Sequence, residues 1–175
     1  APTGGAGRPG RRGRRDYRAP LVVLDRVRDV VQAAHHAVRG GADVTVKNSD
    51  FSHLAVGMTA MSMSGLNILS NSIHDVRIDG VELTAIAGGK IDANNFRDFR
   101  SSPTAHPDAI QVWTSGTNTP TTDLVVSNNI ILPGTGSGGQ GIFIQDEVGT
   151  APHQRITIRN NLLLDAGNYY NGITV

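Results

Sequence analysis

A short segment recurs five times along the chain, each time after a run in which apolar and polar residues alternate. It consists of a small residue or Asn, then any residue, then a large apolar residue that we call the anchor. The anchors lie 22, 23, 35 and 32 residues apart and are Phe51, Ile73, Phe96, Ile131 and Leu163. A period in the low twenties built on strand-like alternation is typical of stacked β-coils, in which each coil packs only on its neighbours. The two longer intervals carry extra Gly, Ser, Thr and Pro, which form loops.

The composition fits such a stack. Of the 175 residues, 38% are apolar and 5% aromatic, and 21 are Gly. Each coil needs only a few inward-facing Val, Ile or Leu, whereas the outer faces and loops use polar residues and glycine. The chain has no Cys, which excludes disulfides and thiolate metal sites. No apolar run approaches the roughly 20 residues of a membrane helix, so we expect a soluble body without a membrane partner.

The first 20 residues differ from the rest of the chain. They are rich in Gly, Pro and Arg and hold six of the 16 basic residues. A nucleic-acid-binding tail is one interpretation of such a segment. We favour a disordered leader or linker, because the segment cannot bury a core, and we expect no nucleic-acid partner.

Residues 21–42 allow two interpretations. Five apolar residues fall on one face at helical spacing before the stop signal Gly40-Gly41; they are Val27, Val30, Val31, Ala34 and Val38. This spacing predicts an N-terminal helix that caps the open end of the stack. The alternative is an additional degenerate coil with a strand over residues 21–24.

A second column of strands follows the turns, over residues 80–83, 109–112, 141–144 and 172–175. Alternation predicts that Glu82, Gln111, Phe143 and Thr174 face outward along this column. Parallel strands lie about 4.8 Å apart, so Glu82 and Gln111 become neighbours despite their separation in sequence. The last of these strands ends at Val175. We therefore expect either a longer solenoid or an uncapped edge that associates into oligomers.

Residues 43–175 resemble the right-handed parallel β-helix of the pectate-lyase-like superfamily. Residues 106–113, HPDAIQVW, resemble a His-x-Asp-x-Ile-Gln segment that is common in secreted β-helix proteins. The resemblance implies an all-β, right-handed parallel β-helix solenoid of about five coils, at the cell surface or outside the cell. Some relatives are polysaccharide lyases and mannuronan C5-epimerases, which implies lyase or epimerase action on an acidic, uronate-containing polysaccharide. A non-catalytic glycan-binding, adhesin or phage-tail module remains the alternative.

Such chemistry requires a base for the proton beside the uronate carboxyl, a group that neutralises the carboxylate, and a proton donor. His106 is the candidate base, because an imidazole with a pKa of about 6.5 accepts protons near neutrality. Asp108 is placed to orient its ring, and Arg100 is a candidate to neutralise the carboxylate. The alternative interpretation of residues 106–108 is a structural turn in which Asp108 caps local amides.

Further candidates surround this segment. The predicted substrate-binding residues are Glu82, Gln111, Trp113, Gln145 and Arg97. Trp113 could stack on a sugar, or it could simply cover an exposed flank of the coil. Glu82 and Gln111 could instead be solvated residues of the outer face. A possible calcium ion would use the oxygen ligands of Asp108, Glu82 and Asp146.

Overall fold

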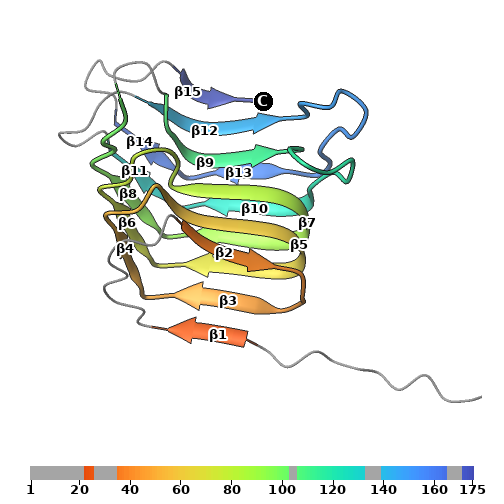
Figure 1. Cartoon of the computed structure of the whole chain (residues 1–175), viewed down its shortest axis with the longest axis horizontal. Coiled ribbons are helices and arrows are strands. Elements are labelled where there is room, and N and C mark those ends of the chain that lie inside the picture. Colours follow the sequence, from red (N-terminus) through yellow and green to blue (C-terminus); the bar gives the residue numbers. More distant parts are fainter. Residues whose placement is uncertain (1–21, 26–34, 103–105, 133–138, 165–170) are drawn as a thin grey trace, which may run out of the picture.

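The computed structural model describes residues 22–25, 35–102, 106–132, 139–164 and 171–175. Every helix or strand assigned in these ranges is a β-strand, and Figure 1 shows the strands stacked as successive coils from β1 to β15. The strands are β1 (Val22–Asp25), β2 (His35–Arg39), β3 (Val44–Lys47), β4 (Asp50–Ser52), β5 (Val56–Leu69), β6 (Ser72–His74), β7 (Val81–Asp92), β8 (Asn95–Arg97), β9 (Asp108–Trp113), β10 (Thr122–Ser127), β11 (Ile130–Ile131), β12 (Gln140–Gln145), β13 (Thr157–Arg159), β14 (Leu162–Leu163) and β15 (Asn171–Thr174).

The strands described form two sheets in which neighbours run parallel. One sheet of ten strands follows the order β1-β3-β5-β7-β9-β12-β15, with β2, β10 and β13 joined to it. The other has five strands in the order β14-β11-β8-β6-β4. The anchors stand in register on this second sheet, as consecutive partners from Phe51 through Ile73, Phe96 and Ile131 to Leu163. The predicted all-β solenoid of parallel coils is thereby confirmed.

Two long strands bend and divide the larger sheet into two faces. In β5, residues 56–61 pair with β2 and residues 67–69 pair with β3. In β7, residues 81–83 pair with β9 and residues 87–92 pair with β10. The backbone is left-handed between these halves, with φ of 55° at Ser62 and 54° at Ala85. These bends turn the chain from one face to the next.

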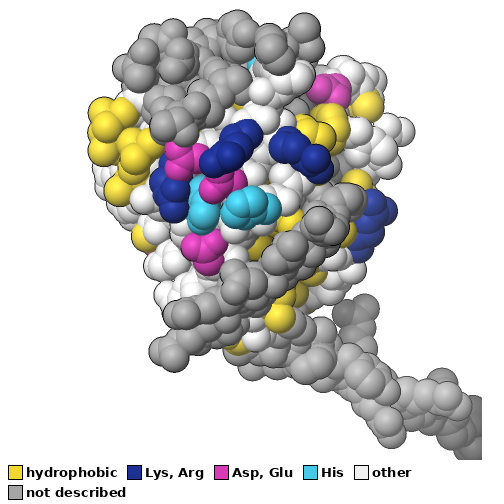
Figure 2. All heavy atoms as spheres, turned by 60° about the vertical axis from the view of Figure 1, so that its left-hand side comes forward, with side chains coloured by type: hydrophobic (Ala, Val, Ile, Leu, Met, Phe, Trp, Pro, Cys, Tyr) yellow, Lys and Arg dark blue, Asp and Glu magenta, His cyan; other side chains and the backbone are white. Residues whose placement is uncertain are grey.

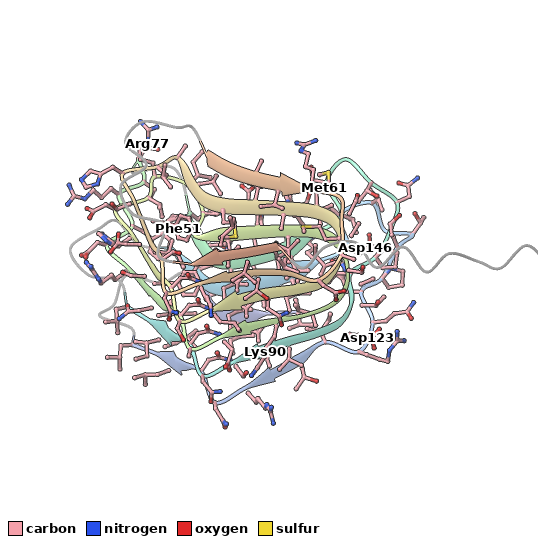
Figure 3. The ribbon with its side chains drawn as sticks, turned by 90° about the horizontal axis from the view of Figure 1, so that it is seen from below. Phe51, Met61, Arg77, Lys90, Asp123 and Asp146 are labelled. Atoms are coloured by element: carbon pink, nitrogen blue, oxygen red, sulfur yellow. The ribbon has the colours of Figure 1, made fainter. Side chains whose placement is uncertain are left out.

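Three faces therefore surround one core. The groove face consists of β2, the first halves of β5 and β7, and β9, β12 and β15. The second face consists of β1, β3, the second halves of β5 and β7, and β10 and β13. The third face is the five-stranded sheet. Figure 3 looks along the stack and shows Met61 on the groove face and Lys90 on the second face.

The core is a set of stacked apolar columns, one from each face. Val81, Leu83, Ile110 and Val112 are fully buried behind the groove face. Val46, Ile68, Ile91 and Val126 line the interior of the second face, and the anchors line that of the third. Each such side chain contributes about 1.5–3 kcal/mol by leaving water. The predicted alternation is thus confirmed on β7, β9 and β12, whereas on β15 Ile173 is exposed.

A ladder of asparagines joins the coils at the start of the third face. The backbone N–H and the amide of Asn94 both donate to Oδ1 of Asn129, each at 3.0 Å. Asn71 makes the same pair of contacts with Asn94, and Asn129 makes it with Asn161. The left-handed backbone of these turns lies one residue before each ladder position, at Asn48, Ser70, Ala93, Asn128 and Asn160. The preceding residue makes the turn, and the Asn side chain is free to bridge coils.

Residues 21–42 differ from the predicted capping helix wherever they are described. β1 pairs in register with β3, and β2 pairs with β5. These strands match the alternative interpretation, an additional degenerate coil. Their β-branched valines favour extended backbone, which pairs with the neighbouring strands of the stack. Residues 26–34 and the predicted leader over residues 1–20 lie outside the described residues. Within the described ranges, no helix has the length and apolarity needed to cross a membrane.

Candidate functional site

The first column of the groove face is polar and lies at the starts of the strands. Asp108 pairs with Gln140, which pairs with Asn171 on the next strand. The backbone N–H of Gly80 donates to the Asp108 carbonyl at 2.8 Å, which sets Asp79 beside Asp108. The column therefore runs from Asp79 through Asp108 and Gln140 to Asn171, one residue from each coil.

Two further columns lie beside it. Glu82 and Gln111 are partners in register, as the sequence predicts, between Thr59 on β5 and Phe143 on β12. Thr59 Oγ1 donates a hydrogen bond of 3.2 Å to Glu82 Oε2. The third column begins with Arg39, Met61 and Thr84, which are also partners in register. Trp113 and Gln145 pair at the corresponding ends of β9 and β12.

Three carboxyl groups meet where the first two columns adjoin. Asp79 and Asp108 are only 6% and 2% exposed, and the backbone N–H of Asp108 donates to Asp79 Oδ1 at 2.6 Å. Burial raises the pKa of Asp79 to about 8, and the nearby Asp108 and Glu82 add to this, although the Asp108 N–H opposes it. Burial likewise raises the pKa of Asp108 to about 7, with the charge of His106 opposing the rise and that of Glu82 adding to it. At neutral pH Asp79 is therefore protonated, and Asp108 is divided between its two forms.

Polar atoms without a partner gather on β9. Asp108 Oδ1, Gln111 Oε1 and Trp113 Nε1 are buried and have no hydrogen-bond partner among the described residues. Asn95 Oδ1 shares this state, whereas buried Asp75 Oδ1, which also lacks a hydrogen bond, is in an ion pair with Arg100. Buried polar groups are almost always hydrogen-bonded, and exceptions are frequent at binding and catalytic sites. Their concentration on one strand marks β9 as the centre of the candidate site.

His106 stands at the entrance to this strand. Its Nδ1 lies 3.4 Å from Nε2 of Gln140, a long contact in which the amide nitrogen is the donor. Gln140 Oε1 accepts a hydrogen bond of 3.1 Å from Asn171 Nδ2. Because His106 also influences the Asp108 pKa, the structure brings the predicted pair of His106 and Asp108 together, next to Glu82.

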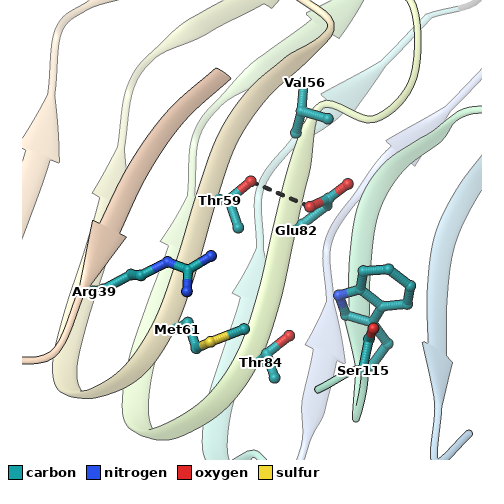
Figure 4. A pocket seen from close by; sticks show the side chains of 8 residues that line it. Arg39, Val56, Thr59, Met61, Glu82, Thr84 and Ser115 are labelled. Carbon is teal, nitrogen blue, oxygen red and sulfur yellow. Dashed lines mark hydrogen bonds between the residues drawn. The ribbon is translucent and has the colours of Figure 1, made fainter. Parts of the chain in front are cut away.

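A groove with a volume of about 290 Å³ crosses the strands, and of the three carboxyl groups Glu82 lines it. The residues that line it include Arg39, Thr59, Met61, Glu82, Thr84 and Trp113. Figure 4 shows the Arg39 side chain reaching from β2 over the neighbouring strand β5, on the same side of the sheet as the Thr59–Glu82 pair. The groove thus combines a cation, a carboxylate and an aromatic side chain, which is a suitable lining for a polar, chain-like ligand.

The predicted arginines do not reach this site. Arg97 ends β8 on the third face and pairs with Asp98 at 2.5 Å. Arg100 forms an ion pair with Asp75, a neighbour of His74 rather than of Asp108. Figure 2 shows the cluster of charged and histidine side chains on the side that includes the third face. Arg97 and Arg100 lie on either side of the corner at Asp98, where φ is 55° and the chain leaves the third face, and both pair with acids there rather than with Asp108.

Gln145 and Asp146 lie at the far end of the strand column. Asp108 pairs with Gln140, so Asp146 is six residues further along, roughly 20 Å at about 3.3 Å per residue. Asp146 caps a loop instead, accepting hydrogen bonds from Thr114 Oγ1 at 3.1 Å and from the Ala151 N–H at 2.8 Å. Figure 3 shows it at the edge opposite Phe51. The three residues predicted to bind calcium are therefore not brought together. No group of three His, Asp or Glu side chains among the described residues could hold a metal ion.

Sequence reasoning missed Asp79, Gln140 and Arg39. The interval of 29 residues that aligns Glu82 with Gln111 also aligns Asp79 with Asp108, so the first of these could have been found. In the same way, the interval from Gln111 to Phe143 aligns Asp108 with Gln140. Arg39 had no comparable signal, because the helical spacing of its segment concealed the strand that carries it.

The fold and the site together define a parallel β-solenoid with a polar groove across one face. A family model described as a right handed beta helix region matches residues 29–175. The chain therefore belongs to this family of right-handed β-helices, a membership that points to a carbohydrate-active or surface β-helix. No curated protein and no solved structure matches the chain.

Proposed function

We propose that this chain acts on an acidic, uronate-containing polysaccharide outside the cell or at its surface, as a lyase or C5-epimerase. The observation that carries the proposal is the buried carboxyl of Asp108. Its Oδ1 has no partner among the described residues, and the group lies near His106 and Glu82, of which Glu82 lines the groove. A buried acid with a pKa of about 7 is costly for a fold, and such groups cluster at catalytic sites.

The proposed reaction is a proton transfer at C5 of the uronate. His106 accepts the C5 proton as its neutral imidazole, and the electron pair of the C5–H bond forms the C4–C5 double bond. The C4–O4 bond breaks, and protonated Asp108 gives its proton to the departing oxygen. In the epimerase variant O4 stays in place, and protonated Asp108 delivers a different proton to C5 on the face opposite His106.

Donors other than arginine would stabilise the substrate carboxylate during this step. The groups that perturb the Asp108 pKa are His106 and Glu82, and no arginine is among them. Gln111 occupies the next outward position of β9, and its amide can donate to a carboxylate. Protonated Asp79 supplies a second donor up to about pH 8. Calcium has no role in this proposal.

The test compares wild type with Asp108→Asn and His106→Ala on polygalacturonate and alginate. We expect wild type to generate an unsaturated product seen by ultraviolet absorbance, or to exchange the C5 proton for deuterium, seen by NMR. Both variants should lose at least a hundredfold in rate, the lower range for removing a general acid or base. Asp123→Asn, which alters an exposed partner of Arg155, is the matched control and should keep full activity.

Wild type that neither cleaves nor exchanges any uronan would refute catalysis on these polymers. If it nevertheless bound them, the non-catalytic glycan-binding module would be the better description. Unchanged rates in both variants would instead remove Asp108 and His106 from the mechanism.

The carboxyl cluster favours one second candidate, hydrolysis of the glycosidic bond. Asp79 lies just before β7, Glu82 lies on β7, and Asp108 lies on the adjacent strand β9. Glycoside hydrolysis usually uses a pair of carboxyl groups on either side of the bond. New reducing ends that appear without an unsaturated product would identify this reaction.

A further inference from the structure

Arg39 differs from the arginines that the described structure pairs with acids. Arg97, Arg100 and Arg155 each form an ion pair with an aspartate. Arg39 is exposed at the end of β2 and has no ion-pair partner among the described residues, although Glu82 lines the same groove. An exposed arginine beside a groove is available to bind an anion, and its planar guanidinium suits a carboxylate.

The groove has a defined direction. Its lining residues come from the neighbouring strands β2, β5, β7 and β9, so the groove extends across four strands of the stack. Three inter-strand steps of about 4.8 Å separate β2 from β9, roughly 14 Å in all. Each step is comparable to the length of one pyranose unit in an extended glycan. A glycan lying in the groove would thus meet one strand with each sugar.

The two ends of the groove offer different chemistry. Arg39 supplies a positive charge at the β2 end, and Met61 contributes an apolar surface beside it. Trp113 lies at the β9 end, where its buried Nε1 has no partner among the described residues. An indole offers a stacking face for a sugar together with one N–H donor.

We propose that Arg39 is a specificity residue that binds the carboxylate of an acidic sugar several units from the one held at β9, so that the groove selects uronate chains over shorter or uncharged ones. This inference rests on the proposed function and names the length and charge of its substrate. Without Arg39, the charged groups lining the groove would reduce to Glu82, which repels a polyanion.

The test measures binding through the fluorescence of Trp113, the chain's single tryptophan. Wild type and Arg39→Ala are titrated with di- and hexagalacturonate and with the fully methyl-esterified, uncharged hexamer. Arg159→Ala, which removes an exposed arginine from the second face, is the matched control. We expect Arg39→Ala to weaken binding of the charged hexamer about tenfold, as for the loss of one charge-assisted contact. Binding of the dimer should be unchanged, and wild type should prefer the charged hexamer to the uncharged one.

The outcomes separate this inference from the proposed function. If Arg39→Ala and Arg159→Ala both bind the charged hexamer as wild type does, the role of Arg39 is refuted while action on uronates stands. Equal wild-type affinity for the charged and uncharged hexamers would also refute it. If wild type neither binds nor converts any of these sugars, both the inference and the proposed function are wrong.

Discussion

Replacing Asp108 with Asn should change how the stability of the protein depends on pH. The folded-state pKa of Asp108 is raised from 3.8 to about 7 by burial. A raised carboxyl pKa means that the folded state holds its proton after the unfolded state has released it. The resulting stability is fully present below the unfolded pKa and is lost as the pH rises through the folded pKa.

The size of this effect follows from the shift. Each unit of pH between the two pKa values costs about 1.4 kcal/mol of unfolding free energy. Between pH 5 and about pH 7, a span of two pH units, the folded state keeps the Asp108 proton that the unfolded state has released. Wild type should therefore lose about 3 kcal/mol of stability through this group between pH 5 and pH 8. Asp79, with a pKa of about 8, adds to the loss in the same window. Asn at position 108 carries no titrating proton and also removes one of the charges that raise the Asp79 pKa.

Urea unfolding at pH 5 and pH 8 measures this dependence directly. Wild type should be less stable at pH 8, and Asp108→Asn should abolish about 3 kcal/mol of that difference. Asp123→Asn is the control. In wild type, the hydrogen bond from Arg155 lowers the pKa of Asp123. The stability that Asp123 contributes is therefore lost only as the pH falls below the pKa of this carboxyl in the unfolded state, outside the window from pH 5 to pH 8. Equal pH dependence in wild type and Asp108→Asn would refute the buried, proton-holding state of Asp108.

Two further predictions concern the fold that holds the site. Asn94→Ala should destabilise the protein by about 3 kcal/mol or more in urea unfolding, because it leaves the buried Ile68 carbonyl and the Asn71 N–H without their partner; a loss below about 1 kcal/mol would contradict a structural ladder. Gly80→Ala should cost about 3 kcal/mol, since the new Cβ would lie 2.5 Å from the Ala109 carbonyl oxygen. Gly88→Ala meets open space and should cost only about 1 kcal/mol for its left-handed φ of 76°; equal losses in the two glycine variants would refute the close packing of coils at Gly80.

The coil repeat allowed much of this fold to be predicted, for a physical reason. Stacked parallel strands keep side chains of successive coils in register, so alternation and spacing alone place Glu82 beside Gln111 and Phe51 beneath Ile73. The same rule brought His106 and Asp108 to the groove face near Glu82.

The corners between faces were beyond such reasoning. Whether a residue belongs to one face or the next depends on single left-handed positions, such as Asp75 and Asp98 with φ of 53° and 55°. Alternation carries no signal for these turns, and Arg97 and Arg100 were therefore assigned to the wrong face. Asp146 was misplaced for a related reason, because nearness to a coil in sequence does not say at which end of the strand a residue lies.

The central claim is that β9 on the groove face is where the protein meets an acidic glycan, and the indole N–H of Trp113 tests it most directly. The chain has one tryptophan, so this N–H gives a single, unambiguous cross-peak in a ¹H–¹⁵N NMR spectrum. On addition of hexagalacturonate to the ¹⁵N-labelled protein, we expect that peak and the backbone amides of β9 to shift together. Unchanged β9 signals, with shifts confined to β4, β6 and β8 on the third face, would contradict the account.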